Sequence, residues 1–157
     1  MWNPLSIFRS NTDTLLSASD KQLLVQAIQA AEKTTSGEIR VFIESHLPKK
    51  MDALQRATEI FFKNNMNETK DRNGVLVYVA LEDKKLAIYG DQAIYEKLGV
   101  EFWYSQVQEM TSHFKNANYV QGMVQVIGAL GEALTENFPF DRVLDTNELS
   151  DEIMIGK

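Results

Sequence analysis

The sequence contains no cysteine among its 157 residues. Disulfide bridges, thiol catalysis and zinc ligation through sulfur are therefore excluded, and a reducing compartment is permitted. Histidine is also scarce, since His46 and His113 are the only two. Neither a histidine metal cluster nor a Ser-His-acid triad is indicated. The chain also lacks the glycine-rich motifs that bind nucleotide phosphates or dinucleotides.

Positive charge and long apolar runs are sparse as well. Basic residues are adjacent only at residues 49–50 and 84–85, the formal net charge is −6 and the pI is about 4.9. Because nucleic acids and anionic membranes bind basic surfaces, we expect no nucleic-acid partner. No stretch approaches the roughly 20 apolar residues of a membrane-spanning helix, and the N-terminus lacks a secretion signal. We therefore expect a soluble, cytoplasmic protein without a membrane anchor.

Two apolar runs, residues 75–81 and 86–89, dominate the middle of the chain. Both are rich in valine, isoleucine, leucine and tyrosine, which favour strands. A charged spacer at residues 82–85 joins them, so the pattern predicts a β-hairpin. Because the strands of a hairpin are antiparallel, the segments that flank the two runs are expected to lie side by side.

Apolar residues at helical spacing surround this hairpin. We predict helices over residues 19–34, 51–66, 92–98, 101–114 and 119–138, and a further strand over residues 38–44. Ser19 and Gln22 have the spacing of a capping box at the start of the first helix. A strand, a helix and a strand in succession predict parallel pairing with a right-handed crossover. The fold class is therefore α/β, with a mixed sheet and a helical C-terminal half.

A single domain of residues 19–139 accounts for these elements. It lies between an N-terminal arm, residues 1–18, and an acidic C-terminal arm or tail, residues 140–157. The tail carries apolar side chains, including Ile153, Met154 and Ile155, which favour an arm docked on the domain over a solvated tail.

Polar side chains gather at one end of the predicted sheet, where two parallel strands begin and the third strand ends. They are Glu38, Asp71, Asn73 and Asp91. Carboxylate and amide oxygens are the ligands of hard cations, and calcium takes roughly 6 to 8 of them. Glu96 and Glu101 follow soon afterwards as possible additional ligands. Alternatively, these acids are separate solvated loop residues, with Asp71 and Asp91 capping a turn or a helix.

Two further features allow more than one interpretation. Arg72 has the geometry for a bidentate contact with an anion, but typical exposure favours a surface arginine. The aromatic run Phe102, Trp103 and Tyr104 indicates a buried cluster with one exposed ring, or else a binding surface.

Several of these segments together resemble the TPM domain family, known from proteins of the thylakoid lumen and photosystem repair and from a modulator of an animal acetylcholine receptor. The segments are residues 35–41 (TSGEIRV), 71–80 (DRNGVLVYVA) and 86–91 (LAIYGD), and Phe114-Lys115 ahead of Tyr119 and Gly122. Residues 90–94 followed by Phe102-Trp103 are similar to a soluble bacterial branch. The resemblance implies a three-layer α/β/α sandwich and binding of a divalent metal, chiefly Ca²⁺ with Mg²⁺ as the alternative.

The sequence departs from the family at the candidate site. Many members have aspartate directly before Asn-Gly, where this chain has Arg72, and many have a Gly-Tyr-Gly-Leu-Glu loop where this chain has residues 90–94. The first hypothesis is a non-catalytic metal-binding domain, an accessory or assembly factor with Asp71 and Asp91 as ligands. The alternatives are a metal-dependent acid phosphatase, as assigned to a plant member, with Arg72 binding phosphate, and a protein-interaction module with an unidentified protein partner.

Overall fold

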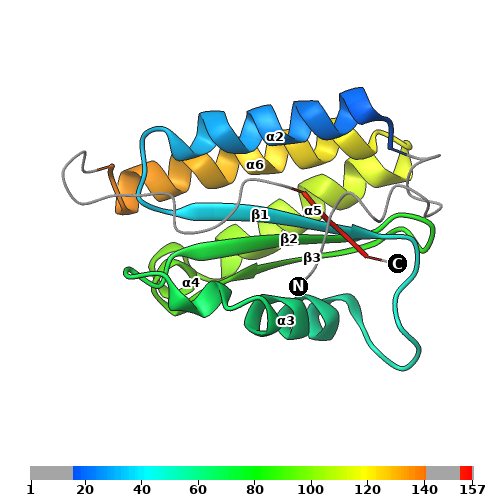
Figure 1. Cartoon of the computed structure of the whole chain (residues 1–157), viewed down its shortest axis with the longest axis horizontal. Coiled ribbons are helices and arrows are strands. Elements are labelled where there is room, and N and C mark those ends of the chain that lie inside the picture. The colour runs from blue at the N-terminus through cyan, green and yellow to red at the C-terminus, as the bar shows by residue number, and fades with distance from the viewer. Residues whose placement is uncertain (1–15, 141–152, 157) are drawn as a thin grey trace.

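A computed structural model of the chain describes residues 16–140 and 153–156, which form a four-stranded mixed sheet in the order β3-β2-β1-β4 (Figure 1). The strands are β1 (Glu38–Glu44), β2 (Gly74–Ala80), β3 (Lys85–Gly90) and β4 (Met154–Ile155). β1 is parallel to β2 and to β4, whereas β2 and β3 form an antiparallel hairpin. The predicted strand-helix-strand unit and hairpin are both present.

Helices cover both faces of this sheet. They are α2 (Ala18–Glu32), α3 (Ala53–Lys63), α4 (Gln92–Leu98), α5 (Val100–Lys115) and α6 (Tyr119–Asn137), with a 3₁₀ turn η2 (Met66–Glu68) after α3. Figure 1 shows α2 and α6 above the sheet and α3 below it. The predicted three-layer α/β/α sandwich is therefore confirmed.

The alternation of side chains along β1 and β2 divides the core into two parts. Ile39, Val41 and Ile43 face α2, α5 and α6, and Phe42 faces the α3 layer together with Tyr78. Continuous apolar strands of this kind are expected where both faces of a sheet are covered. The two buried clusters hold the starts of β1 and β2 and the end of β3 in register at the candidate site.

The N-cap of the first helix lies two residues earlier than the sequence pattern predicts. Ser17, not Ser19, is the N-cap, and its side chain accepts from the backbone N–H of Asp20 while the Asp20 carboxylate accepts from the Ser17 N–H, both at 3.1 Å. The reason is that Ser17 and Asp20 provide the same three-residue spacing, and Ser17 adopts the extended backbone (φ −71°, ψ 167°) that a cap requires.

The short C-terminal strand β4 pairs in parallel with β1 at the edge of the sheet. Ile153, Met154 and Ile155 are buried, and the backbone N–H of Gly156 donates to the carbonyl of Ile43. Residues 1–15 and 141–152, which include most of both predicted arms, lie outside the described residues. Among the helices that the structure describes, none combines the length and apolarity needed to cross a membrane.

Candidate functional site

The loops before β1 and β2 and the end of β3 meet at one end of the sheet. Glu38 pairs in register with Gly74, and Val75 pairs with Gly90. The backbone N–H of Asp91 donates to the Gly74 carbonyl at 2.9 Å. Five of the sequence-predicted site residues, Glu38, Asp71, Arg72, Asn73 and Asp91, therefore lie within or beside this junction.

Arg72 and Asp91 form a bidentate ion pair across the junction. The Nε and Nη2 groups of Arg72 donate to the two carboxylate oxygens of Asp91, each at 2.7 Å. Asp91 is buried, whereas the side chain of Arg72 is 41% exposed. The hydrogen bonds that Arg72 donates to Asp91 raise the pKa of Arg72 above its ordinary value. The negative charge of Asp91 is thus neutralised from within the chain.

Asp91 also has a role in local structure. It is the N-cap of α4, and one carboxylate oxygen accepts from the backbone N–H of Gln92 at 2.8 Å. The backbone of Arg72 is left-handed, with φ of 51°, a conformation that costs free energy in a residue with a side chain. The ion pair and the hydrogen bond from the Ala93 N–H to the Arg72 carbonyl hold that conformation.

A second chain of polar contacts lies beside this pair. Ser36 Oγ donates to Asp71 Oδ2, and Asn73 Nδ2 donates to Ser36 Oγ, both at 3.1 Å. An ionised carboxylate only accepts, so the Ser36 hydroxyl donates its proton to Asp71 and accepts from the amide of Asn73. This sequence of donors orients the amide and leaves Asn73 Oδ1 pointing away from Ser36.

Asn73 Oδ1 is the unusual atom of the site. Asn73 is fully buried, and its Oδ1 accepts no hydrogen bond within the part of the chain that the structure describes. A buried oxygen without a partner costs about 1–3 kcal/mol, so native proteins usually satisfy it with water, an ion or a ligand. The amide of Asn73 is connected to the carboxylate of Asp71 through its Nδ2 and the Ser36 hydroxyl, whereas Oδ1 takes no part in that chain.

The side-chain oxygens of Asp71, Ser36 and Asn73 provide part of the ligand set that a hard cation needs. Asp71 is half-buried, and Ser36 and Asn73 add neutral oxygens beside it. Within residues 16–140 and 153–156, no three acidic or histidine side chains converge to hold a metal. Glu96 and Glu101 are exposed on α4 and α5, and no hydrogen bond or ion pair among the described residues joins them to Asp71. The donor set is therefore one carboxylate with neutral oxygens, plus Glu38, buried at the start of β1.

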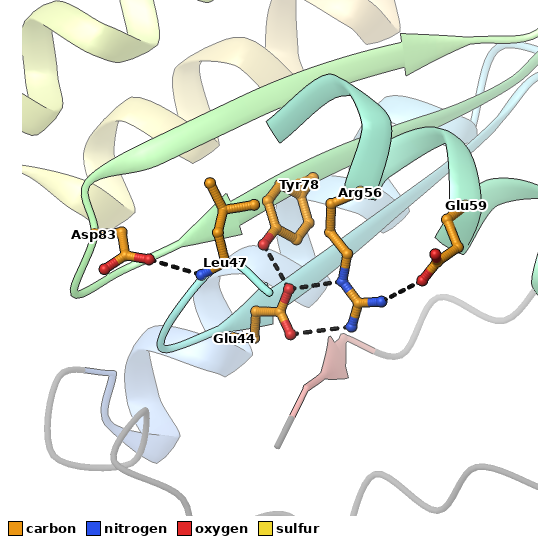
Figure 2. Close-up of polar contacts among 6 residues, drawn as sticks. All are labelled: Glu44, Leu47, Arg56, Glu59, Tyr78 and Asp83. Carbon is orange, nitrogen blue, oxygen red and sulfur yellow. Dashed lines mark hydrogen bonds and ion pairs between the residues drawn. The ribbon is translucent and has the colours of Figure 1, made fainter. Parts of the chain in front are cut away.

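A third polar cluster lies at the other end of β1 and was not evident from the sequence. Figure 2 shows Tyr78 and Arg56 both directed at the carboxylate of Glu44. The Tyr78 hydroxyl donates to Glu44 Oε2 at 2.5 Å, and Arg56 donates to both Glu44 oxygens at 2.9 and 3.1 Å. Burial, and then the hydrogen bond to Glu44, raises the pKa of Tyr78. The sequence feature that could have indicated this cluster is a glutamate and a tyrosine at buried positions of two neighbouring strands.

His46 lies near this cluster, in the loop after β1. Its Nε2 is 2.6 Å from Glu82 Oε2 and its Nδ1 is 2.9 Å from Asp83 Oδ1. Asp83 also accepts from the backbone N–H of Leu47 at 2.7 Å (Figure 2). The hydrogen bond with Asp83 raises the pKa of His46 and lowers that of Asp83. This cluster ties the loop after β1 to the hairpin turn.

The aromatic run at the start of α5 is a buried cluster with one exposed ring. Trp103 is buried and Phe102 is half-buried, whereas Tyr104 is 65% exposed. The Trp103 ring lies against Gly90, where an added Cβ would be 2.6 Å from the indole. This glycine therefore permits the close approach of α5 to the end of β3.

Comparison with known proteins identifies relatives of the whole fold. A sequence model of the TPM domain matches residues 10–133. The NMR structure of the BA42 protein from the psychrophilic bacterium Bizionia argentinensis is 40% identical, with a TM-score of 0.82, over 90% of this chain and 95% of that one. The N-terminal domain of cg2496 from Corynebacterium glutamicum is 12% identical, with a TM-score of 0.63 over 81% of each chain, and shares the fold. No curated protein matches.

Proposed function

Because the chain belongs to the TPM domain family, we propose that it is a non-catalytic domain that binds one divalent cation, Ca²⁺ in preference to Mg²⁺, as a cytoplasmic accessory or assembly factor. The observation that carries this proposal is the buried Asn73 Oδ1 without a hydrogen-bond partner among the described residues. The Nδ2 of the same amide donates to the Ser36 hydroxyl, which in turn donates to the carboxylate of Asp71. An amide oxygen without a partner and a carboxylate on the same loop are ligands of the kind that a hard cation takes.

The ligands that we propose are Asp71 and Asn73, with the Ser36 hydroxyl beside them and Glu38 in a second tier. A bound cation supplies positive charge that draws the loop before β1 and the loop before β2 together. Because calcium affinity rises with the number of charged ligands, a site with one leading carboxylate is expected to bind weakly, with Kd of about 10⁻⁴ to 10⁻³ M.

Asp91 is a ligand in this proposal only when Arg72 moves away. Both of its oxygens accept from the Arg72 guanidinium, so a cation and Arg72 compete for the same carboxylate. The predicted binding of a phosphate by Arg72 meets the same competition from Asp91. Phosphatase activity stays a prediction on the resemblance alone.

Titration of the ¹⁵N-labelled full chain with CaCl₂, followed by NMR, tests the site. We expect the amide resonances of Ser36, Asp71 and Asn73 to shift, and a parallel titration with MgCl₂ to give a weaker response. Asp71→Asn keeps the shape of the side chain but removes its charge, and is expected to abolish the shifts. Asp83→Asn, at the opposite end of the sheet, is the matched control. Shifts that are absent, or that survive in Asp71→Asn, contradict the proposal.

A further inference from the structure

Three large apolar side chains are exposed together where α4 meets α5. Tyr95 is 43% exposed, Val100 is 67% exposed and Tyr104 is 65% exposed. Val100 and Tyr104 are the two most exposed large hydrophobic residues in the part of the chain that the structure describes. We call these three side chains, with their neighbours Glu96 and Glu101, the α4–α5 surface. Single exposed apolar residues are ordinary, but a group of them marks an interaction site.

The exposure of these residues does not mean that α5 lacks contacts with the core. α5 also has a buried side, formed by Trp103, Met110 and Phe114. Val100 and Tyr104 are four residues apart, so they project from the same outer side of the helix. The exposed residues are thus additional to the packing that holds α5 in place.

The aromatic part of the surface has a rigid support. The Tyr95 ring stacks on Trp103, with ring centroids 5.9 Å apart and an interplanar angle of 15°. Trp103 is itself held by a hydrogen bond from its Nε1 to the Tyr95 carbonyl at 3.2 Å and by its contact with Gly90. Rings that are ordered before binding lose little conformational entropy when a partner docks.

The charges beside these rings are acidic. Glu96 and Glu101 are exposed, and neither forms an ion pair with a described residue. The one basic side chain between them, Lys97, has its Nζ over the ring of Phe138, 5.4 Å from the centroid. That cation–π contact directs Lys97 toward the end of α6, so the two glutamates set the charge of the surface.

We propose that the α4–α5 surface docks a basic amphipathic segment of a partner protein. Apolar side chains of the partner contact Val100 and Tyr104, while its lysine or arginine side chains pair with Glu96 and Glu101. An arginine side chain of the partner contributes additional binding free energy by stacking on the exposed tyrosine rings. Complementary charge at the rim of an apolar contact steers association and selects the partner. The inference goes beyond cation binding and depends on none of the residues near Asp71.

Two synthetic peptides of 14 residues test the charge complementarity. One is a helical pattern of leucine and lysine, and the other has glutamate in place of each lysine. In NMR titrations of the ¹⁵N-labelled full chain, the lysine peptide is expected to shift the resonances of Tyr95, Val100 and Tyr104. The glutamate peptide is expected to bind at least about tenfold more weakly. Added salt is expected to weaken the binding of the lysine peptide. Equal binding of both peptides, or no binding of either, overturns the proposal.

Variants then locate the contact. Val100→Ser with Tyr104→Ser is expected to weaken binding of the lysine peptide at least about tenfold, since both residues are exposed and the fold is retained. Leu54→Ser, which removes an equally exposed leucine (55%) from α3, is the matched control and leaves binding unchanged. Shifts centred on α3, or full binding by the double variant, refute the assignment. Concentration-dependent shifts at Val100 and Tyr104 without peptide assign the surface to a second copy of the chain instead.

Discussion

The guanidinium of Arg72 holds both carboxylate oxygens of the buried Asp91 at 2.7 Å, and so closes the gap between the start of β2 and the end of β3. An arginine in this position provides fixed positive charge at a junction where the sequence predicts a metal ion. The pair therefore stabilises the junction without a cation and reduces the negative charge that is available to bind one.

Arg72→Ala is expected to lower the free energy of unfolding and to increase the response to calcium. Without the guanidinium, the buried Asp91 carboxylate has lost its counter-ion, and a divalent cation gains an additional ligand. Thermal unfolding of the variant and of the wild type, each with and without CaCl₂, measures both effects. Arg72→Lys, which keeps the charge but loses the bidentate geometry, is expected to be intermediate. An equal calcium response in wild type and Arg72→Ala contradicts the competition.

Gly90→Ala and Gly128→Ala are expected to change stability in opposite directions. An added Cβ at Gly90 would be 2.6 Å from the Trp103 ring, whereas Gly128 has nothing within 4 Å. Overpacking at Gly90 is expected to cost about 1–3 kcal/mol, and alanine at the helical Gly128 to add about 1 kcal/mol. Urea unfolding measures both, and tryptophan fluorescence reports on Trp103. A Gly90→Ala variant as stable as wild type would show that α5 does not need this close approach.

Tyr78→Phe is expected to destabilise the fold by about 1 kcal/mol, because it removes the hydroxyl that donates to Glu44. Glu44→Ala is expected to cost about 3 kcal/mol or more, since it leaves the tyrosine hydroxyl without its acceptor and the mostly buried Arg56 with Glu59 as its remaining acidic partner. Urea unfolding gives both values. Tyr104→Phe, which removes an exposed hydroxyl, is the control and is expected to have no effect; a loss as large as that of Tyr78→Phe would argue against a special role for the buried bond.

The His46 cluster is expected to make stability fall as the pH rises above 6.5. The pKa of His46 in the folded protein is raised above 6.5 by the hydrogen bond with Asp83. Its contribution is therefore complete below pH 6.5 and is lost as the pH rises through the raised pKa. Urea unfolding across this window measures the effect, and salt is expected to reduce it because His46 is exposed. His46→Gln should remove this part of the pH dependence; an unchanged profile excludes His46 as its source.

Local patterns in the sequence account for most of the fold. The two apolar runs predict β2 and β3 because side chains in a strand alternate between two covered faces, and helical spacing predicts α4 and α6 almost to the residue. The first N-cap was less certain, because Ser17 and Ser19 both precede a polar residue by three positions. Backbone geometry selected Ser17.

The sequence by itself determined the mixed sheet and the meeting of the loops at residues 36–38, 71–73 and 90–91, since the directions of the first three strands follow from periodicity and connection length. The resemblance to the family implied the three layers. Only the tertiary structure decided how the charges at that end are divided. Arg72 pairs with Asp91 across 19 positions of sequence, and Ser36 reaches Asp71 across 35. Such contacts depend on side-chain directions that no local pattern encodes, because each is set by the packing of strands and helices that are distant in the chain.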